Sequence, residues 1–175
     1  MLNHNSSSKK RPTNKNTFRH FICGALAVFC LSSCVSTKHA SISGKARVVD
    51  GDTLFVNSTK IRLAFVDAPE LKQTCIHKKS KRVIKCGEQS KSVLQKLIEG
   101  KNILCTERTS DLYRRILAEC YLNAINVNQY MISSGYAILY KTARQYLPEQ
   151  EKAKKLGKGI WKTDFQEPWI WRKED

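Results

Sequence analysis

The clearest fold signal in this chain is the segment KARVVDGDTLFVNSTKIRLAFVDAPE, residues 45–70. Its apolar residues fall in three short runs rich in Val, Ile, Leu and Phe, and turn-forming pairs (Gly-Asp and Asn-Ser) separate them. We therefore predict three strands in a meander, at residues 45–49, 53–57 and 60–66. Pro69 forbids continuation of the third strand, which leaves Asp67 and Glu70 at its end.

The rest of the chain predicts helices around one hairpin. A long basic loop at 71–87 is followed by a helix over 88–99, whose apolar residues share one face before Gly100. Further elements follow in order: strands at 101–107 and 115–122 around a turn near 110–114, and helices at 126–134 and 148–156. Five short strands in about 80 residues suit a small barrel. We predict an α+β fold, an OB-fold five-stranded β-barrel with three helices.

Residues 1–33 have the parts of a secretory signal. Residues 1–20 are polar and carry five basic residues and no acid, Phe21–Leu31 is apolar, and small residues follow up to Cys34. No stretch reaches the ~20 consecutive apolar residues that a transmembrane helix needs. We therefore expect export of the chain into the cell envelope, the periplasm or the medium.

The run Leu31-Ser32-Ser33-Cys34 resembles a bacterial lipoprotein box, in which cleavage before the cysteine leaves it acylated. This resemblance implies a lipid anchor at Cys34. The alternatives are an ordinary cleaved signal or an uncleaved anchor, with Cys34 incidental. Residues 34–43 are small and polar and are expected to form a tether. The folded domain is then expected at 44–175.

The charge of the chain favours a polyanionic partner. Lys and Arg number 31 against 15 Asp and Glu, a net charge of +16. Removing residues 1–33 takes away five basic residues, so 26 remain against 15 acids, or +11. Residues 1–33 therefore do not explain the positive charge of the chain. Nucleic acid or an anionic membrane surface is the expected class of partner.

Four cysteines remain after Cys34, and an even number in an exported chain favours disulfides with three possible connectivities. In the predicted hairpin, Cys105 and Cys120 lie opposite one another, close enough to bond. We therefore favour Cys105–Cys120 together with Cys75–Cys86, which closes a Lys-rich loop. A zinc site is the alternative, but no two of these cysteines have CxxC spacing and only His77 lies nearby.

Acidic and arginine side chains lie at strand ends. Asp52 sits at a strand–turn junction, and Asp67 and Glu70 end the third strand. Carboxylates and carbonyls at such positions suit hard divalent cations, and the planar forks of Arg62 and Arg115 suit phosphate oxygens. These are the parts of phosphodiester hydrolysis.

Each of these residues also has an ordinary structural interpretation. Asp-Gly is a common turn pair, an arginine in a strand is often a surface residue, and loop acids are often solvated. Arg62 and Asp67 are five residues apart, so a regular strand points them to opposite faces. If both reach one site, the strand must bulge or end, and we predict this irregularity between Ala64 and Ala68.

Taken together, the motifs resemble those of the staphylococcal nuclease (thermonuclease) family over residues 44–171. In chain order they are Asp50-Gly51-Asp52-Thr53, the run Arg62–Glu70, the turn Asp111-Leu112-Tyr113-Arg114-Arg115, Gly135-Tyr136-Ala137 and Gly159-Ile160-Trp161. The tail Pro168–Arg172 and the four cysteines resemble exported bacterial members. Leu112 and Arg114 depart from the residues that are often found in the family's turn.

The resemblance implies Ca²⁺-dependent hydrolysis of DNA and RNA that leaves 3′-phosphates. It assigns Ca²⁺ binding to Asp52, Asp67 and the backbone carbonyl of Ala68, which stands where the family usually has Thr. Glu70 would hold or deprotonate the attacking water.

The resemblance also implies roles around the phosphate. Arg62 and Arg115 would stabilise the charge that develops on phosphorus. Tyr113 and Tyr140 would pack on or bond to the nucleotide, although Tyr140 has the alternative role of a packing residue at the barrel edge. The basic residues of 71–87 would either follow the nucleic-acid backbone or form a solvated loop.

We therefore expect an exported, lipid-anchored and monomeric calcium-dependent nuclease with little sequence specificity. One alternative is a catalytically inactive OB-fold nucleic-acid-binding lipoprotein, since OB barrels often bind single strands. Another is an envelope lipoprotein whose barrel binds a protein or a glycan.

Overall fold

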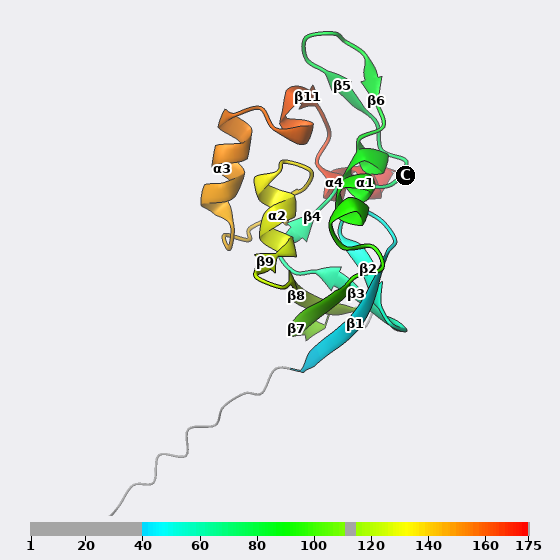
Figure 1. Cartoon of the computed structure of the whole chain (residues 1–175). Helices are drawn as coiled ribbons and strands as arrows, with labels where there is room; N and C mark the ends of the chain where they lie inside the picture. Colours follow the sequence, from blue (N-terminus) through cyan, green and yellow to red (C-terminus); the bar gives the residue numbers. More distant parts are fainter. Residues whose placement is uncertain (1–39, 111–114, 175) are drawn as a thin grey trace, which may run out of the picture. The chain divides into compact units, whose positions relative to one another are not determined.

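A computed structural model describes residues 40–110 and 115–174 (Figure 1). In this part of the chain five strands close into a barrel. They are β1 (Ser41–Val48), β2 (Thr53–Val56), β3 (Thr59–Leu63), β7 (Asn102–Ser110) and β8 (Ile116–Leu122). Neighbours in the order β3-β2-β1-β7-β8 pair antiparallel, and a parallel pairing of β3 with β8 closes the ring. The predicted α+β OB-type barrel is confirmed.

Four helices surround the barrel in the described residues, one more than predicted. They are α1 (Cys86–Ile98), α2 (Val127–Ser133), α3 (Leu147–Lys155) and α4 (Pro168–Glu174). The additional one is α4, whose seven residues carry no helical repeat. Short helices are held by packing rather than by propensity, so the sequence pattern did not predict it.

The hairpin β7–β8 has the predicted register. Cys105 lies opposite Cys120, and the pairing shifts by one residue at a bulge between Glu107 and Thr109. The disulfides Cys105–Cys120 and Cys75–Cys86 are both formed, as expected. The first ties two barrel strands together, and the second closes the loop before α1.

Two segments are more ordered than the sequence suggested. β1 begins at Ser41, inside the expected tether, because residues 41–45 pair with β7. The expected loop at 71–87 contains a small hairpin, β5 (Cys75–His77) with β6 (Val83–Ile84). Figure 1 shows this hairpin projecting at the end of the domain away from the barrel strands. Its β5 strand also pairs with β11 (Thr163–Asp164).

Apart from a small separate cluster of Cys75, Cys86, Ile138 and Ile160, the buried apolar side chains form one large core that fills the barrel and the space beneath the helices. Its fully buried members come from strands and helices alike, for example Leu54, Ile61, Leu94 and Met131. Asn128 of α2 is one of several buried polar side chains. Its side-chain amide donates to the carbonyls of Ala64 and Ala118, both at 3.0 Å. These bonds satisfy the backbone at the point where β3 leaves the barrel.

Several expectations lie outside the described residues: the signal at 1–33, the acylated Cys34, the first part of the tether, and Tyr113 in the 111–114 turn. In the described ranges, no helix has the length and apolarity needed to span a bilayer.

Candidate active site

The turn between β1 and β2 fixes Asp52. The carboxylate of Asp50 accepts hydrogen bonds from the backbone N–H groups of Asp52 (3.0 Å) and Thr53 (2.7 Å). Gly51 makes this turn possible, because a Cβ there would lie 2.2 Å from the Ser90 Oγ and 2.6 Å from the Ala68 Cβ. Only glycine lets the turn lie this close to α1, so Asp50-Gly51 is more than a generic hairpin turn.

Arg62 and Asp67 reach the same site because the third strand breaks between them. β3 ends at Leu63, Phe65 adopts a φ of 66°, and β4 (Val66–Asp67) pairs with β10 (Ile138–Leu139) instead of the barrel. The predicted irregularity between Ala64 and Ala68 is therefore confirmed. The change of partner strand turns Asp67 toward Arg62.

A buried ion-pair network joins these residues. The Arg62 guanidinium donates to the Oδ1 of Asp52 (2.7 Å) and to the Oδ1 of Asp67 (2.9 Å). The second oxygen of Asp52 accepts from the backbone N–H of Ala68 (3.0 Å). Asp67 is fully buried, and its Oδ2 has no hydrogen-bond partner among the described residues. A buried carboxylate oxygen without a partner is costly, which favours a further ligand at this position.

A third arginine, which the sequence analysis did not assign, completes the cluster. Arg172 of α4 donates to the Oδ1 of Asp67 (2.7 Å) and also to the carboxylate of Glu70. Burial opposes the charge on this guanidinium, but its bonds to Glu70 and Asp67 outweigh burial and raise the pKa of Arg172. In the sequence, Arg172 was noted only as the last residue of the tail at 168–172. No short-range spacing could link it to Asp67 and Glu70, which lie about a hundred positions earlier.

Two aspartates of the site have raised pKa values. Burial raises the pKa of Asp67 to about 6, with the charge of Asp52 adding to the shift, despite the opposing effect of both arginines. Burial, followed by the charge of Asp52, likewise raises the pKa of Asp50 to about 6. Negative charge is thus crowded into a poorly hydrated site, a common property of metal-binding and catalytic centres.

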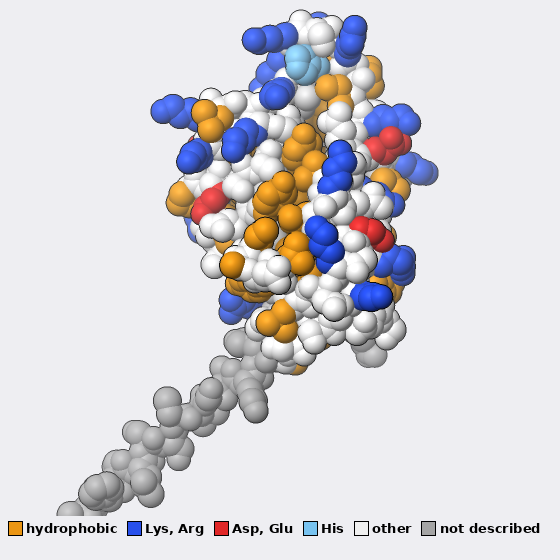
Figure 2. Space-filling model, in the orientation of Figure 1, with side chains coloured by type: hydrophobic (Ala, Val, Ile, Leu, Met, Phe, Trp, Pro, Cys, Tyr) orange, Lys and Arg blue, Asp and Glu red, His pale blue; other side chains and the backbone are white. Residues whose placement is uncertain are grey.

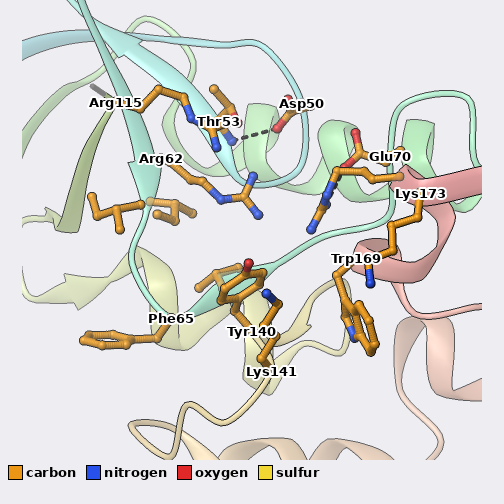
Figure 3. Close-up of a pocket in the computed structure, with 14 residues that line it drawn as sticks. Asp50, Thr53, Arg62, Phe65, Glu70, Arg115, Tyr140, Lys141, Trp169 and Lys173 are labelled. Carbon is orange, nitrogen blue, oxygen red and sulfur yellow. Dashed lines mark hydrogen bonds and ion pairs between the residues drawn. The ribbon is translucent and has the colours of Figure 1, made fainter. Parts of the chain in front are cut away.

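The cluster forms the wall of a pocket of about 690 Å³. Glu70 and the arginines at 62, 115 and 172 line it, together with Tyr140, Lys141, Trp169 and Lys173. In Figure 3, Arg62 and Arg115 lie across the pocket from Tyr140 and Trp169. Arg115 directly follows residues 111–114, which lie outside the described part of the chain, and directly precedes β8. The structure therefore brings the predicted residues at 52, 62, 67, 68, 70, 115 and 140 to one region.

The donor set suits a hard cation. Asp52 and Asp67 offer carboxylate oxygens, and the unpartnered Oδ2 of Asp67 is already desolvated. Over residues 40–110 and 115–174, no three His, Cys, Asp or Glu side chains form a metal cluster by themselves. A Ca²⁺ ion takes about 6–8 oxygen ligands, so backbone, water or substrate oxygens must complete the set.

Comparison with known proteins agrees with this geometry. Residues 60–163 match the family model for the staphylococcal nuclease homologue. The chain belongs to the staphylococcal nuclease family.

Three relatives show the range of sequence identity and coverage. A protein of Escherichia coli described as an uncharacterized endonuclease is 36% identical over 143 residues, covering 76% of this chain and 86% of the relative. One with the same description from Haemophilus influenzae is 33% identical over 83% of this chain and 79% of its own length. The probable staphylococcal-like nuclease CAN3 of Oryza sativa is 28% identical over 70% of this chain, but only 31% of its own length is matched.

Proposed function

We propose that this protein is a Ca²⁺-dependent nuclease that hydrolyses DNA and RNA with little sequence specificity and leaves 3′-phosphates. One observation carries the proposal. Three acids (Asp52, Asp67 and Glu70) and two arginines (Arg62 and Arg172) from three separate parts of the chain are joined by ion pairs of 2.5–2.9 Å, and Arg115 lines the adjoining pocket. Family membership and the nuclease descriptions of its relatives support the reaction class.

The arginines would bind the phosphate that is cleaved. Arg62 and Arg115 both line the pocket, and a guanidinium fork matches two phosphate oxygens at once. Charge grows on these oxygens as water attacks phosphorus, and donors already in place stabilise it most. Arg62 is held on two sides by aspartates, so its orientation does not depend on the substrate.

Glu70 would accept a proton from the attacking water. Its side chain lines the pocket and is about one third exposed, so water reaches it. The ion pair with Arg172 fixes its direction. As the new bond from water oxygen to phosphorus forms, the bond to the 5′-oxygen breaks; this oxygen takes a proton from solvent and leaves as a 5′-hydroxyl, and the phosphate stays on the 3′ side.

Asp52, Asp67 and the Ala68 carbonyl would hold the Ca²⁺ ion. When bound, the ion supplies positive charge against the phosphate oxygens and helps to lower the barrier to attack. The desolvated Oδ2 of Asp67 is the feature of this chain that supports the assignment.

Digestion of denatured DNA and of RNA, with Ca²⁺ or with EGTA, tests the proposal. A soluble chain starting near Ser41 should cleave both substrates with Ca²⁺ and neither in EGTA. Arg62→Ala should lower the rate by about 10²–10³-fold, the effect of removing one preorganised donor. Full activity in EGTA would refute the role of calcium, and products that a polymerase extends without phosphatase treatment would refute 3′-phosphate ends.

The same assay separates the alternative functions. A catalytically inactive OB module would bind the oligonucleotides with no cleavage under any metal condition. A lipoprotein that recognises a protein or glycan would do neither. The presence of all the acids and arginines of the motifs favours the enzyme.

We also propose that the protein acts as a monomer outside the cytoplasm, anchored through Cys34. The two disulfides support an oxidising location. Palmitate labelling of the full chain, with Cys34→Ser as the control, tests the anchor. Labelling that survives in Cys34→Ser would exclude it.

A further inference from the structure

A buried glutamine fastens the turn that carries Glu70. Gln73 is fully buried, and its side-chain oxygen accepts a hydrogen bond from the backbone N–H of Glu70 (3.1 Å). The backbone N–H of Gln73 donates in turn to the carbonyl of Glu70 (2.7 Å). Both bonds lie within one tight turn, so the direction in which the Glu70 side chain leaves the backbone depends on Gln73.

The same side chain reaches the segment that leads into α4. The Nε2 of Gln73 donates to the carbonyl of Gln166 (2.7 Å), two residues before α4 begins. From α4, Arg172 returns to the site and donates to the carboxylate of Glu70, which lies beside this helix in Figure 3. Gln73 therefore joins the two segments that hold the backbone and the carboxylate of Glu70.

The disulfide Cys75–Cys86 closes the chain on the other side of Gln73. Gly87 follows the second cysteine and donates its N–H to the Gln73 carbonyl (3.2 Å). No side chain fits at this position, because a Cβ on Gly87 would lie 1.8 Å from the carbonyl oxygen of Glu70. The disulfide thus holds the first turn of α1 against the turn that carries Glu70.

The non-covalent contacts that close this loop are few. β5 pairs with β6 and with β11 over two residues each, and Ile76 and Val83, which face one another in the hairpin, are 47% and 70% exposed. Residues 71–87 carry six Lys or Arg and no acid. Figure 2 shows exposed Lys and Arg side chains at the end of the domain where Figure 1 places the hairpin. Because like charges repel and a two-stranded hairpin is marginally stable by itself, the closed loop depends on its disulfide.

We propose that Gln73 is a positioning residue for Glu70, and that it holds Glu70 and α4 together only after the Cys75–Cys86 disulfide has formed, so that oxidation activates the enzyme. The proposal rests on the proposed function and adds regulation of the same site. Both thiols lose their protons as the two sulfurs join, and the two electrons pass to a disulfide-bearing oxidant, whose own S–S bond breaks into two thiols. In a reducing compartment the chain keeps its thiols, so rapid hydrolysis waits for an oxidising location.

Matched cysteine variants of the full chain test the activation. With denatured DNA and Ca²⁺, Cys75→Ala/Cys86→Ala should have a kcat about 10- to 100-fold below the wild type, because misplacing a reacting group by ~1 Å costs about that much. Cys105→Ala/Cys120→Ala is the control, since that disulfide ties two barrel strands; below its unfolding temperature, its kcat should stay within about threefold of the wild type. In mixtures of glutathione and its disulfide, kcat of this control should rise as the remaining cysteine pair is oxidised.

Gln73→Met tests the positioning, because Met keeps the length of the side chain but makes neither hydrogen bond. It should lower kcat by a similar factor of about 10–100 and change KM by less than about threefold, since Arg62 and Arg115 are not part of this loop. In a Glu70→Gln background, neither Gln73→Met nor Cys75→Ala/Cys86→Ala should lower kcat much further. A loss caused by general destabilisation would persist in that background.

Amide hydrogen exchange gives a measurement that does not require cleavage. Residues 70–73 and 166–174 should exchange faster in Gln73→Met and in Cys75→Ala/Cys86→Ala than in the wild type, while β1 and β2 keep the wild-type rate.

The results separate the two proposals. A wild type that cleaves, with unchanged kcat in both variants or with equal losses in the Glu70→Gln background, overturns the activation and positioning alone. A wild type that never cleaves refutes the nuclease proposal. In that case faster exchange in both segments supports the link through Gln73, and unchanged exchange overturns it as well.

Discussion

Replacing Arg172 by Gln should destabilise the metal-free domain, although this residue belongs to a seven-residue helix at the end of the chain. Removing one partner of a fully buried ion pair costs about 3–5 kcal/mol. Asp67 is fully buried, but it keeps Arg62 at 2.9 Å, and the Arg172 side chain is 32% exposed. We therefore expect about half of that cost, ~2 kcal/mol. The pair with Glu70, in which both side chains are about one third exposed, adds at most about 0.5 kcal/mol.

A loss of this size lowers Tm by about 8–10 °C for a domain of this length. The measurement is thermal unfolding by circular dichroism in EGTA, with Arg144→Gln as the control, since Arg144 is exposed and lies far along the chain from α4. Ca²⁺ should then raise the Tm of Arg172→Gln by more than it raises the Tm of the wild type. The reason is that the ion replaces the positive charge that the substitution has removed from beside Asp67. A Tm within about 1 °C of the wild type in EGTA would show that α4 is not docked on the acids as described.

Three further predictions follow from the same structure. Replacing both Cys105 and Cys120 by Ala should cost about 3 kcal/mol, from the 15-residue separation that the disulfide spans, as measured by urea unfolding; an unchanged midpoint would contradict it. Gly51→Ala should cost about 1–3 kcal/mol by overpacking and should weaken Ca²⁺ binding in calorimetry, because the new Cβ must displace Ser90 or Ala68; a fully stable variant with normal Ca²⁺ affinity would be the opposite result. The pKa of Asp67 is raised from 3.8 to about 6, so its folded form binds the proton more tightly than the unfolded chain. In EGTA, wild-type stability relative to Asp67→Asn should therefore fall as pH rises from about 4 to about 6, by up to ~3 kcal/mol, and stay constant above that range. A relative stability that rises with pH would contradict the sign.

Local patterns in the sequence were enough for most of the barrel. Short apolar runs between turn pairs placed β2 and β3, and the facing cysteines gave the register of β7 with β8. These signals lie within one strand or across one turn, so the short-range pattern of apolar and turn residues is enough to predict the strands. The predicted first strand began too late, at residue 45 instead of Ser41. The residues from Ser41 on have no apolar alternation, and they form a strand because they pair with β7.

The composition of the site was also readable from the sequence, because motifs carry the residue types that a phosphate and a cation require. The spacing of Arg62 and Asp67 even required a break in the strand, and the structure supplies it through the positive φ of Phe65 and the exchange of partner strands. Arg172 and Trp169 could not be placed in this way. They reach the pocket only because α4 returns to the start of the barrel about a hundred residues later.

The sequence by itself determined the net charge and the chemical groups of the site, indicated most of the barrel strands and favoured the disulfide partners, since each of these depends on residue type or on short spacing. Only the tertiary structure decided that Arg62 and Arg172 share the acids and that Arg115, Tyr140 and Trp169 line the same pocket. Contacts between distant segments depend on how the helices pack on the barrel, and that packing minimises exposed apolar surface for the whole chain rather than for any one motif.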